Sequence, residues 1–147
     1  NTVISYGDIV FRDNILHELI NSESDISVIV DADTSHRNGY IDFVKTDKPW
    51  SRAAFNPIVS LEQMSAKMPP ESAQGEFIGL WKVNAKGAAV VREALEKLSG
   101  RDDFKSLRMA DLFNELASAA KVSVIYTRGS WIDIDSVVDL TQAGELT

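Results

Sequence analysis

The residues with the clearest chemical pattern in this sequence are aspartates at or just beyond the C-terminal ends of short apolar runs. Five of them stand out: Asp8, Asp31, Asp33, Asp133 and Asp135. If the runs are strands of one sheet, these carboxylates lie at the edge where open α/β sheets bind ligands. Carboxylates that meet there can hold a hard cation such as Mg²⁺, which prefers oxygen ligands. Aspartates also cap helices and fill turns, so each one has a structural alternative.

Fewer candidates come from the other residue types. Glu76 lies inside an otherwise apolar run, where burial of an unpaired carboxylate is costly, unless its side chain points to solvent. Arg52 and Lys48 lie in an irregular stretch and are candidates to meet a phosphate or phosphonate, although loop cations are usually only solvated. His17 and His36 are isolated and predict no metal site. The chain has no cysteine, which excludes disulfides, thiolate zinc sites and thiol nucleophiles.

Composition limits the classes of protein that fit. The 147 residues are 44% hydrophobic and 25% charged, which is enough apolar material for one globular domain over residues 1–147. The net charge of −7 disfavours a nucleic-acid partner. No apolar run approaches the roughly 20 residues of a spanning helix, and no targeting segment is visible. We therefore expect a cytoplasmic protein without a membrane or nucleic-acid partner.

Short β-rich runs alternate with helical patterns, which predicts an α/β domain with a mixed, largely parallel sheet flanked by helices. The expected strands are residues 2–6, 25–30, 40–45, 75–83 and 122–126. The expected helices are residues 12–21, 86–98 and 109–120, and a short last helix opened by a capping box of Ser136 and Asp139. Residues 34–39 read as a turn. The stretch 46–74 holds all four prolines, so loops or edge strands are expected there.

Three segments carry a more specific pattern. They are Ser5-Tyr6-Gly7-Asp8-Ile9-Val10-Phe11, Gly75-Glu76-Phe77-Ile78-Gly79-Leu80 and Trp131-Ile132-Asp133-Ile134-Asp135-Ser136-Val137-Val138-Asp139-Leu140. The last resembles the W-x-D-I-D-[ST]-x-x-D-L signature of nucleotidyltransferases with a glycosyltransferase-A-like fold, and the first resembles their central GDI segment. The second resembles the GEFIGL strand of the phosphocholine and phosphonate cytidylyltransferases, a branch with domains fused to phosphoenolpyruvate mutase in phosphonate biosynthesis.

The resemblance implies a Rossmann-like nucleotidyltransferase fold and a specific reaction. A nucleotidyl group, cytidylyl in this branch, would pass from CTP or another nucleoside triphosphate to a small phosphonate or phosphate, with release of pyrophosphate. Asp8 and Asp135 would hold the catalytic Mg²⁺, with Asp133 as the second choice for the late motif. Glu76 would face the amine or quaternary ammonium of the acceptor, and Asp31 and Arg52 would line the same site. Trp131 is expected to pack beneath it.

The acceptor implied by the resemblance is 2-aminoethylphosphonate or 2-hydroxyethylphosphonate, followed by phosphocholine or a sugar 1-phosphate. The family's Gly-rich loop, which cradles the nucleotide, has no counterpart in this sequence, which starts at the GDI segment. We therefore expect an incomplete domain, inactive by itself for lack of that loop. Its open sheet edge near residues 1–6 would pair with a second copy, and a fused mutase domain is a further expected partner.

Three alternatives remain open at this point. The first is a sugar-nucleotide glycosyltransferase that uses Asp31-x-Asp33 to hold its metal. The second is a non-catalytic interaction module that only folds, dimerises or docks. The third is an aspartyl phosphoacceptor domain. The segment Ala120-Lys121 also departs from the nucleotidyltransferase pattern, which often has a glycine before the last strand.

Overall fold

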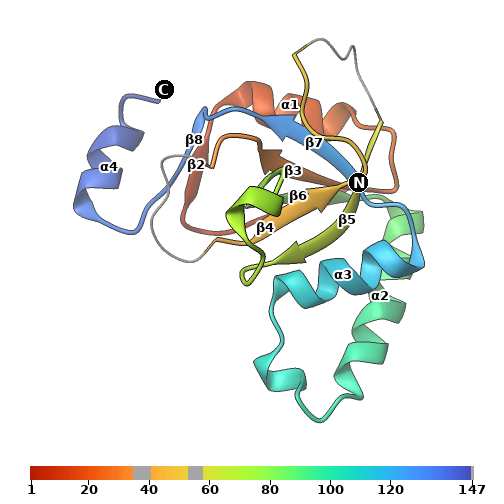
Figure 1. Cartoon of the computed structure of the whole chain (residues 1–147). Helices are drawn as coiled ribbons and strands as arrows, with labels where there is room; N and C mark the ends of the chain where they lie inside the picture. Colours follow the sequence, from red (N-terminus) through yellow and green to blue (C-terminus); the bar gives the residue numbers. More distant parts are fainter. Residues whose placement is uncertain (35–40, 53–57, 147) are drawn as a thin grey trace.

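A computed structural model describes residues 1–34, 41–52 and 58–146 of the chain (Figure 1). The expected turn at 34–39, except Thr34, lies outside the described residues, as do His36, Tyr40 and Pro57. The strands are β1 (Thr2–Ser5), β2 (Ile9–Phe11), β3 (Ile26–Asp31), β4 (Phe43–Thr46), β5 (Val59–Ser65), β6 (Gly75–Val83), β7 (Ser123–Thr127) and β8 (Trp131–Asp133). The helices are α1 (Asp13–Asn21), α2 (Ala85–Ser99), α3 (Met109–Ala119) and α4 (Val137–Ala143), with 3-10 turns at Pro70–Ser72 and Phe104–Ser106.

The main sheet has the strand order β1-β6-β3-β7-β5-β4, and β4 also pairs with β6. Five strands therefore close into a ring, and β1 lies outside it. The mixed α/β class is confirmed, but the expectation of a largely parallel sheet is wrong. Among the described strands only β3 and β7 pair in parallel. The reason is that β6 inserts antiparallel between β1 and β3, which run in the same direction, and β4 and β5 form a hairpin.

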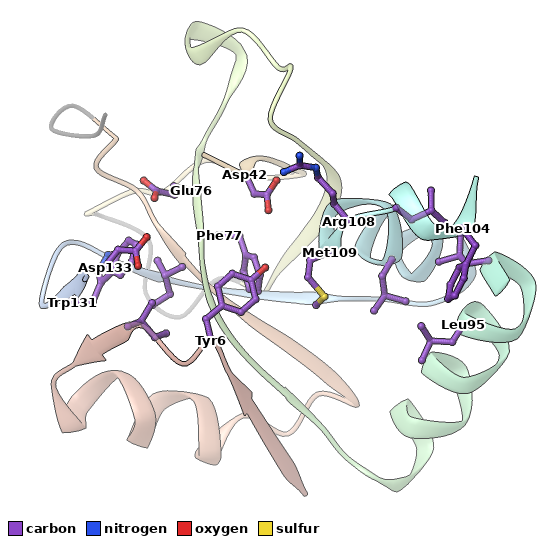
Figure 2. A pocket seen from close by; sticks show the side chains of 15 residues that line it. Tyr6, Asp42, Glu76, Phe77, Leu95, Phe104, Arg108, Met109, Trp131 and Asp133 are labelled. Carbon is purple, nitrogen blue, oxygen red and sulfur yellow. The ribbon is translucent and has the colours of Figure 1, made fainter. Parts of the chain in front are cut away.

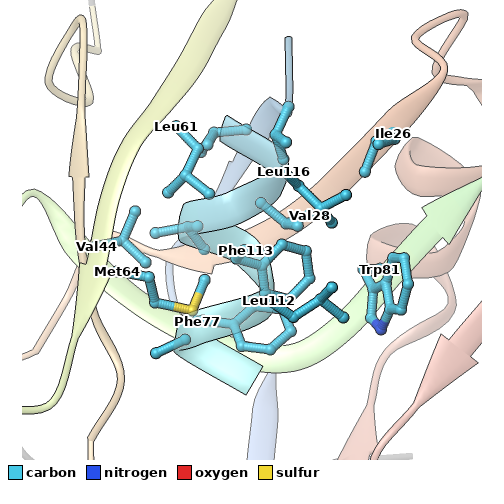
Figure 3. Close-up of a cluster of buried hydrophobic side chains, with 14 of the residues drawn as sticks. Ile26, Val28, Val44, Leu61, Met64, Phe77, Trp81, Leu112, Phe113 and Leu116 are labelled. Carbon is cyan, nitrogen blue, oxygen red and sulfur yellow. The ribbon is translucent and has the colours of Figure 1, made fainter. Parts of the chain in front are cut away.

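The interior is divided by β3 and β6, because alternate side chains of a strand point to opposite faces. One face contributes to a large apolar core against α2 and α3, in which Phe113 lies 5.0 Å from Phe77 and 5.3 Å from Trp81 between ring centroids (Figure 3). The opposite face supports a smaller core built from Ile15, Leu19, Ile29, Ile78, Leu80 and Trp131. This smaller core joins α1 and β8 to the sheet.

Most elements lie where the sequence places them. The strand at 75–83 coincides with β6, and the three long helices agree with the expected ranges to within one residue. Ser136 caps α4 as expected, because its hydroxyl accepts from the Asp139 N–H at 3.3 Å. The reciprocal bond differs from that of a capping box: the Asp139 carboxylate accepts from the Ser136 hydroxyl at 2.7 Å and from the N–H of Asp135, one residue earlier, at 3.2 Å. The prediction missed β2 and β8, because a three-residue strand is too short to show a period of two. No helix within the described ranges has the length and apolar character to cross a membrane.

Candidate functional site

Strands β2 and β8 form a separate antiparallel ladder in which Ile9 pairs with Asp133. A hydrogen bond of 2.8 Å from the backbone N–H of Ile134 to the carbonyl of Asp8 extends this ladder by one position. Asp8 and the late aspartates are far apart in the sequence, and the ladder places their backbones on adjoining strands. Asp8 and Asp135 are exposed and Asp133 is half-buried. The structure therefore brings together the chain segments of all three residues expected to bind metal.

Asp135 lies in the bend between β8 and α4. Its backbone N–H donates to the Asp139 carboxylate at 3.2 Å, and the same carboxylate accepts from the Ser136 hydroxyl. Asp139 is thus occupied with the start of α4, whereas the Asp135 side chain remains at the surface. Asp135 and Asp139 therefore have different surroundings, and Asp135 is the more exposed of the two.

The donor chemistry around the β2–β8 ladder suits Mg²⁺, which binds carboxylate oxygens and usually keeps several waters. Within the described part of the chain, however, no group of three or more His, Cys, Asp or Glu side chains is arranged to hold a metal ion. A cation at Asp8 and Asp135 would need additional oxygen ligands from a phosphate or from water. The metal roles of Asp8, Asp133 and Asp135 remain predictions.

A cavity of about 580 Å³ opens beside the Ile9–Asp133 pair (Figure 2). Its carboxylates come from three parts of the chain: Asp133 in β8, Glu76 in β6, and Asp42 just before β4. Glu76 and Asp42 are only 6% and 9% exposed. In Figure 2 the guanidinium of Arg108 points toward Asp42. The cavity therefore has an acidic part with one arginine at its margin.

Aromatic side chains form the middle of the cavity wall. Tyr6 and Phe77 meet edge to face with ring centroids 5.9 Å apart, and Trp131 also lines the cavity. Gly79 makes room for Tyr6, because a Cβ at this position would collide with the tyrosine ring and the backbone has φ +84°. The far part, at the right of Figure 2, contains Leu95 and Phe104. Further apolar lining of the cavity comes from Leu98, Leu107, Met109 and Leu112.

Asp31 ends β3 and is 2% exposed, and it is not among the described residues that line the cavity. Its Oδ2 accepts a hydrogen bond of 2.7 Å from Trp131 Nε1. The backbone N–H of Gly129 lies 3.3 Å from Oδ1 and 3.2 Å from Oδ2, and the N–H of Asp33 lies 2.9 Å from Oδ1. All four hydrogen bonds are internal. The acceptor role expected for Asp31 is untested, and the observed contacts are those of a structural carboxylate.

Two further predicted residues lie apart from the cavity. Arg52 is exposed in the turn after Trp50 and is not among the described lining residues. Lys48 donates from its ammonium group to the carbonyl of Ile58 at 3.2 Å. The Asp33 carboxylate faces Arg128 at 3.7 Å, and that guanidinium lies 4.8 Å from the Trp50 ring centroid. The acceptor role of Arg52 remains a prediction.

The sequence reasoning did not single out Asp42 or Arg108. Asp42 carried a usable signal, since it lies among the apolar residues Ile41, Phe43 and Val44, as Glu76 lies in its own apolar run. Its carbonyl accepts a hydrogen bond of 3.0 Å from the N–H of Phe77, which places it beside β6. Arg108 precedes α3 and has no comparable signal in the sequence.

No family model matches this sequence, and no curated protein has a significant sequence match to it. Solved structures do share its fold. The inositol-1-phosphate CTP transferase from T. maritima matches with a TM-score of 0.68 and 15% identity, over 98% of this chain and 53% of that one. The UDP-glucose pyrophosphorylase from Acinetobacter baumanii matches with a TM-score of 0.65 and 14% identity, over 96% and 48%.

A nucleoside-diphosphate-sugar pyrophosphorylase from Vibrio cholerae RC9 matches with a TM-score of 0.56 and 18% identity, over 97% of this chain and 57% of that one. The chain thus spans about half the length of the structures it matches. At these identities the likeness concerns the fold. Over nearly all of its length, the chain has a fold found in nucleotidyl-transferring enzymes.

Proposed function

We propose that this chain supplies the metal-binding and acceptor-binding part of a nucleotidyltransferase. The observation that carries the proposal is the Ile9–Asp133 pair, which belongs both to the β2–β8 ladder and to the wall of the acidic cavity. A site for a cation and a pocket for an acceptor are therefore continuous. Nucleotidyl transfer needs both, because its catalysis depends on positioning the reactants and neutralising phosphate charge.

In the proposed reaction, a phosphonate or phosphate oxygen of the acceptor attacks the α-phosphorus of CTP, and pyrophosphate leaves. Mg²⁺ held by Asp8 and Asp135, with Asp133 as the alternative to Asp135, would neutralise charge on the phosphates. CTP is favoured over other nucleoside triphosphates by the GEFIGL resemblance at residues 75–80. The shared fold supports nucleotidyl transfer in general, since the matches include both an inositol-1-phosphate CTP transferase and a UDP-glucose pyrophosphorylase. A place in phosphonate biosynthesis, a fused mutase domain and a cytoplasmic location rest on the resemblance or on composition alone.

The proposed acceptor carries a positive charge beside its phosphonate, as 2-aminoethylphosphonate does. Glu76, Asp42 and Asp133 give the cavity an acidic part, which favours an ammonium group over the neutral hydroxyl of 2-hydroxyethylphosphonate. Tyr6 and Phe77 supply ring surfaces in the same cavity, and cations are attracted to such surfaces. The quaternary ammonium of phosphocholine shares this chemistry and is the next candidate.

The metal part of the proposal is tested with Asp8→Asn and Asp135→Asn in the full-length protein. We expect each to lower turnover by about a hundredfold or more. A neutral amide would hold Mg²⁺ more weakly than a carboxylate does, so less charge on the phosphates would be neutralised. Circular dichroism and the unfolding midpoint should stay near wild type, since both side chains are exposed. Asp102→Asn, an exposed aspartate outside the site, is the matched control. Near-normal turnover in both site variants would refute the metal assignment.

The acceptor part is tested with Glu76→Gln. We expect KM for 2-aminoethylphosphonate to rise by about 10- to 100-fold, the effect of losing one charged hydrogen bond, while KM for CTP changes little. The matched control is Glu62→Gln, because Glu62 lies on β5, is exposed and pairs with Lys45 at 3.3 Å, away from the cavity. An equal rise in KM for 2-hydroxyethylphosphonate would mean that Glu76 does not recognise the amine.

A further inference from the structure

We propose that Asp31 is a positioning residue, which holds Trp131 and the preceding turn so that β8 directs Asp133 into the cavity. The effect of Asp31 on catalysis rests on the proposed function, whereas its effect on the position of Trp131 can be measured in a protein without activity. Asp31 acts through other residues and does not itself line the cavity among the described residues.

The carboxylate of Asp31 is engaged by three donors. Oδ2 accepts from Trp131 Nε1, Oδ1 accepts from the Asp33 N–H, and the Gly129 N–H is shared between the two oxygens. Trp131 is buried as well, so the 2.7 Å bond between the two side chains is shielded from water. Buried hydrogen bonds to a charged group are among the stronger ones in proteins. Asp31 therefore fixes the indole ring instead of a ligand.

The turn at Gly129 and Ser130, which leads into β8, is held by hydrogen bonds to residues outside the turn. Gly129 and Ser130 both have φ +64°, and a non-glycine residue in this region is strained by about 1–3 kcal/mol. Asp31 holds the Gly129 N–H, and the N–H of Ala32 donates to the Thr127 carbonyl at 2.9 Å. On the other side, the N–H of Arg12 donates to the Ser130 carbonyl at 3.0 Å. The end of β3 is thus one of two anchors of this turn.

The link from Trp131 to the cavity follows from the geometry of a strand. Residues i and i+2 of a strand share a face, so the orientation of Trp131 determines that of Asp133. Both side chains line the same cavity, which agrees with this rule. The indole is held by the Asp31 hydrogen bond and by the small core around Ile78 and Leu80. Loss of the hydrogen bond should allow Trp131 to shift and carry Asp133 with it.

Asp31 also lies opposite Glu76 in the β3–β6 pairing. Side chains in directly opposed positions are about 4.5–5.5 Å apart, and like charges there are destabilising. The three donors around Asp31 offset this repulsion on one side of the pair. Glu76 is therefore the member of the pair that lines the cavity, and Asp31 is the member that holds Trp131 and the Gly129 turn.

The structural test is amide and indole hydrogen exchange in the full chain, followed by NMR, with the Trp131 signal assigned by its loss in Trp131→Phe. In Asp31→Asn an NH₂ replaces one of the two acceptor oxygens, and the one remaining oxygen is uncharged and must serve three donors. The bond to Trp131 is then lost or weakened, so the Trp131 indole N–H should exchange at least about tenfold faster than in wild type. Asp33→Asn is the matched control at the same sheet edge and should leave this exchange unchanged. Unchanged indole exchange in Asp31→Asn would overturn the proposal. If Asp31→Asn does not fold, faster exchange of the Gly129 N–H in Trp131→Phe supports the proposal, and unchanged exchange overturns it.

The functional test measures kcat and KM of the full-length protein and its variants with CTP and 2-aminoethylphosphonate. We expect Asp31→Asn to lower kcat at least about tenfold with little change in KM for CTP, and Trp131→Phe to act in the same direction. Asp33→Asn should keep wild-type values. Equal losses in Asp31→Asn and Asp33→Asn, with a raised Mg²⁺ requirement, would identify an Asp-x-Asp metal pair and overturn the positioning role. Absence of nucleotidyl transfer in the full-length wild-type protein would refute the proposed function, and the exchange experiment would still decide the role of Asp31.

Discussion

The two faces of β3 and β6 differ in what they bury. The face toward α2 and α3 presents only apolar side chains: Ile26, Val28, Val30, Phe77, Trp81 and Val83. The face toward α1 and β8 also presents apolar residues, but among them are the buried ionisable side chains of Asp31, Glu76 and Lys82. The same two strands therefore separate a purely apolar side from a side with buried charges. The cavity reaches both sides, because Phe77, Leu98 and Leu112 of the large core and Ile78 and Trp131 of the small core line it.

This difference has an energetic meaning. Burial of apolar area is non-directional, so the large core tolerates substitutions that keep volume and shape. A buried charge must have partners in the right geometry, so the α1 face depends on individual hydrogen bonds. The hydrogen-bond partners come from other elements: Trp131 of β8 donates to Asp31, and the Ser22 carbonyl at the end of α1 accepts from Lys82. The acidic residues Asp31 and Glu76 thus lie on the less tolerant of the two faces.

The largest effect on stability is expected from Phe113→Ala in the large core. Phe113 is fully buried and contacts the rings of Phe77 and Trp81, so its truncation should lower the free energy of unfolding by about 3–5 kcal/mol. Urea unfolding followed by circular dichroism measures it. Phe104→Ala is the matched control, because Phe104 is 44% exposed and should cost less than about 1.5 kcal/mol. Equal costs would mean that the large core does not dominate the fold.

A smaller effect is expected from Gly79→Ala, which lies where the apolar face meets the cavity. The φ of +84° disfavours any other residue by about 1–3 kcal/mol, and the added methyl group would displace the Tyr6 ring. We expect lower stability in urea and a loss of NMR contacts between Tyr6 and Phe77. Gly100→Ala is the control, since Gly100 ends α2 in a right-handed helical conformation with only an ordinary contact to the Lys97 carbonyl. Retained Tyr6–Phe77 contacts would show that Gly79 does not shape the cavity.

The apolar face was largely predictable from the sequence, and the other face was not. The helical period, with Gly100 as a stop for α2, gives the three long helices to within one residue, and an almost continuous apolar run gives β6, which is buried along its whole length. Glu76 was found because a charge interrupts an apolar run, and the same rule applies to Asp42 and Lys82, which were not singled out. The ring closure between β4 and β6 and the Asp31–Trp131 bond join distant segments. Local sequence contains no direct record of such pairings.

The smallest effect concerns Lys82, the buried cation of the α1 face. It is 1% exposed, and its ammonium group donates to the carbonyl of Ser22 at the C-terminal end of α1, where a positive charge is favourable. Burial nevertheless lowers the pKa of Lys82 below its ordinary value of 10.5. At a pH between the lowered pKa of the folded state and about 10.5, the unfolded chain binds more protons at Lys82 than the folded one. This group therefore makes the free energy of unfolding rise with pH up to about 10.5.

Lys82→Met removes that contribution. The free energy of unfolding of wild type, measured relative to Lys82→Met, should therefore increase as the pH is raised from about 7 toward about 10. The exposed Lys105→Met variant, which also loses one positive charge, should stay parallel to wild type over the same range. Phe113→Ala should likewise lower stability without changing its dependence on pH, because the substitution removes no ionisable group and Phe113 contacts the apolar rings of Phe77 and Trp81. Parallel curves for wild type and Lys82→Met would mean that the α1 face holds its buried lysine without energetic cost, and the contrast between the two faces would then rest on Asp31 and Glu76 alone.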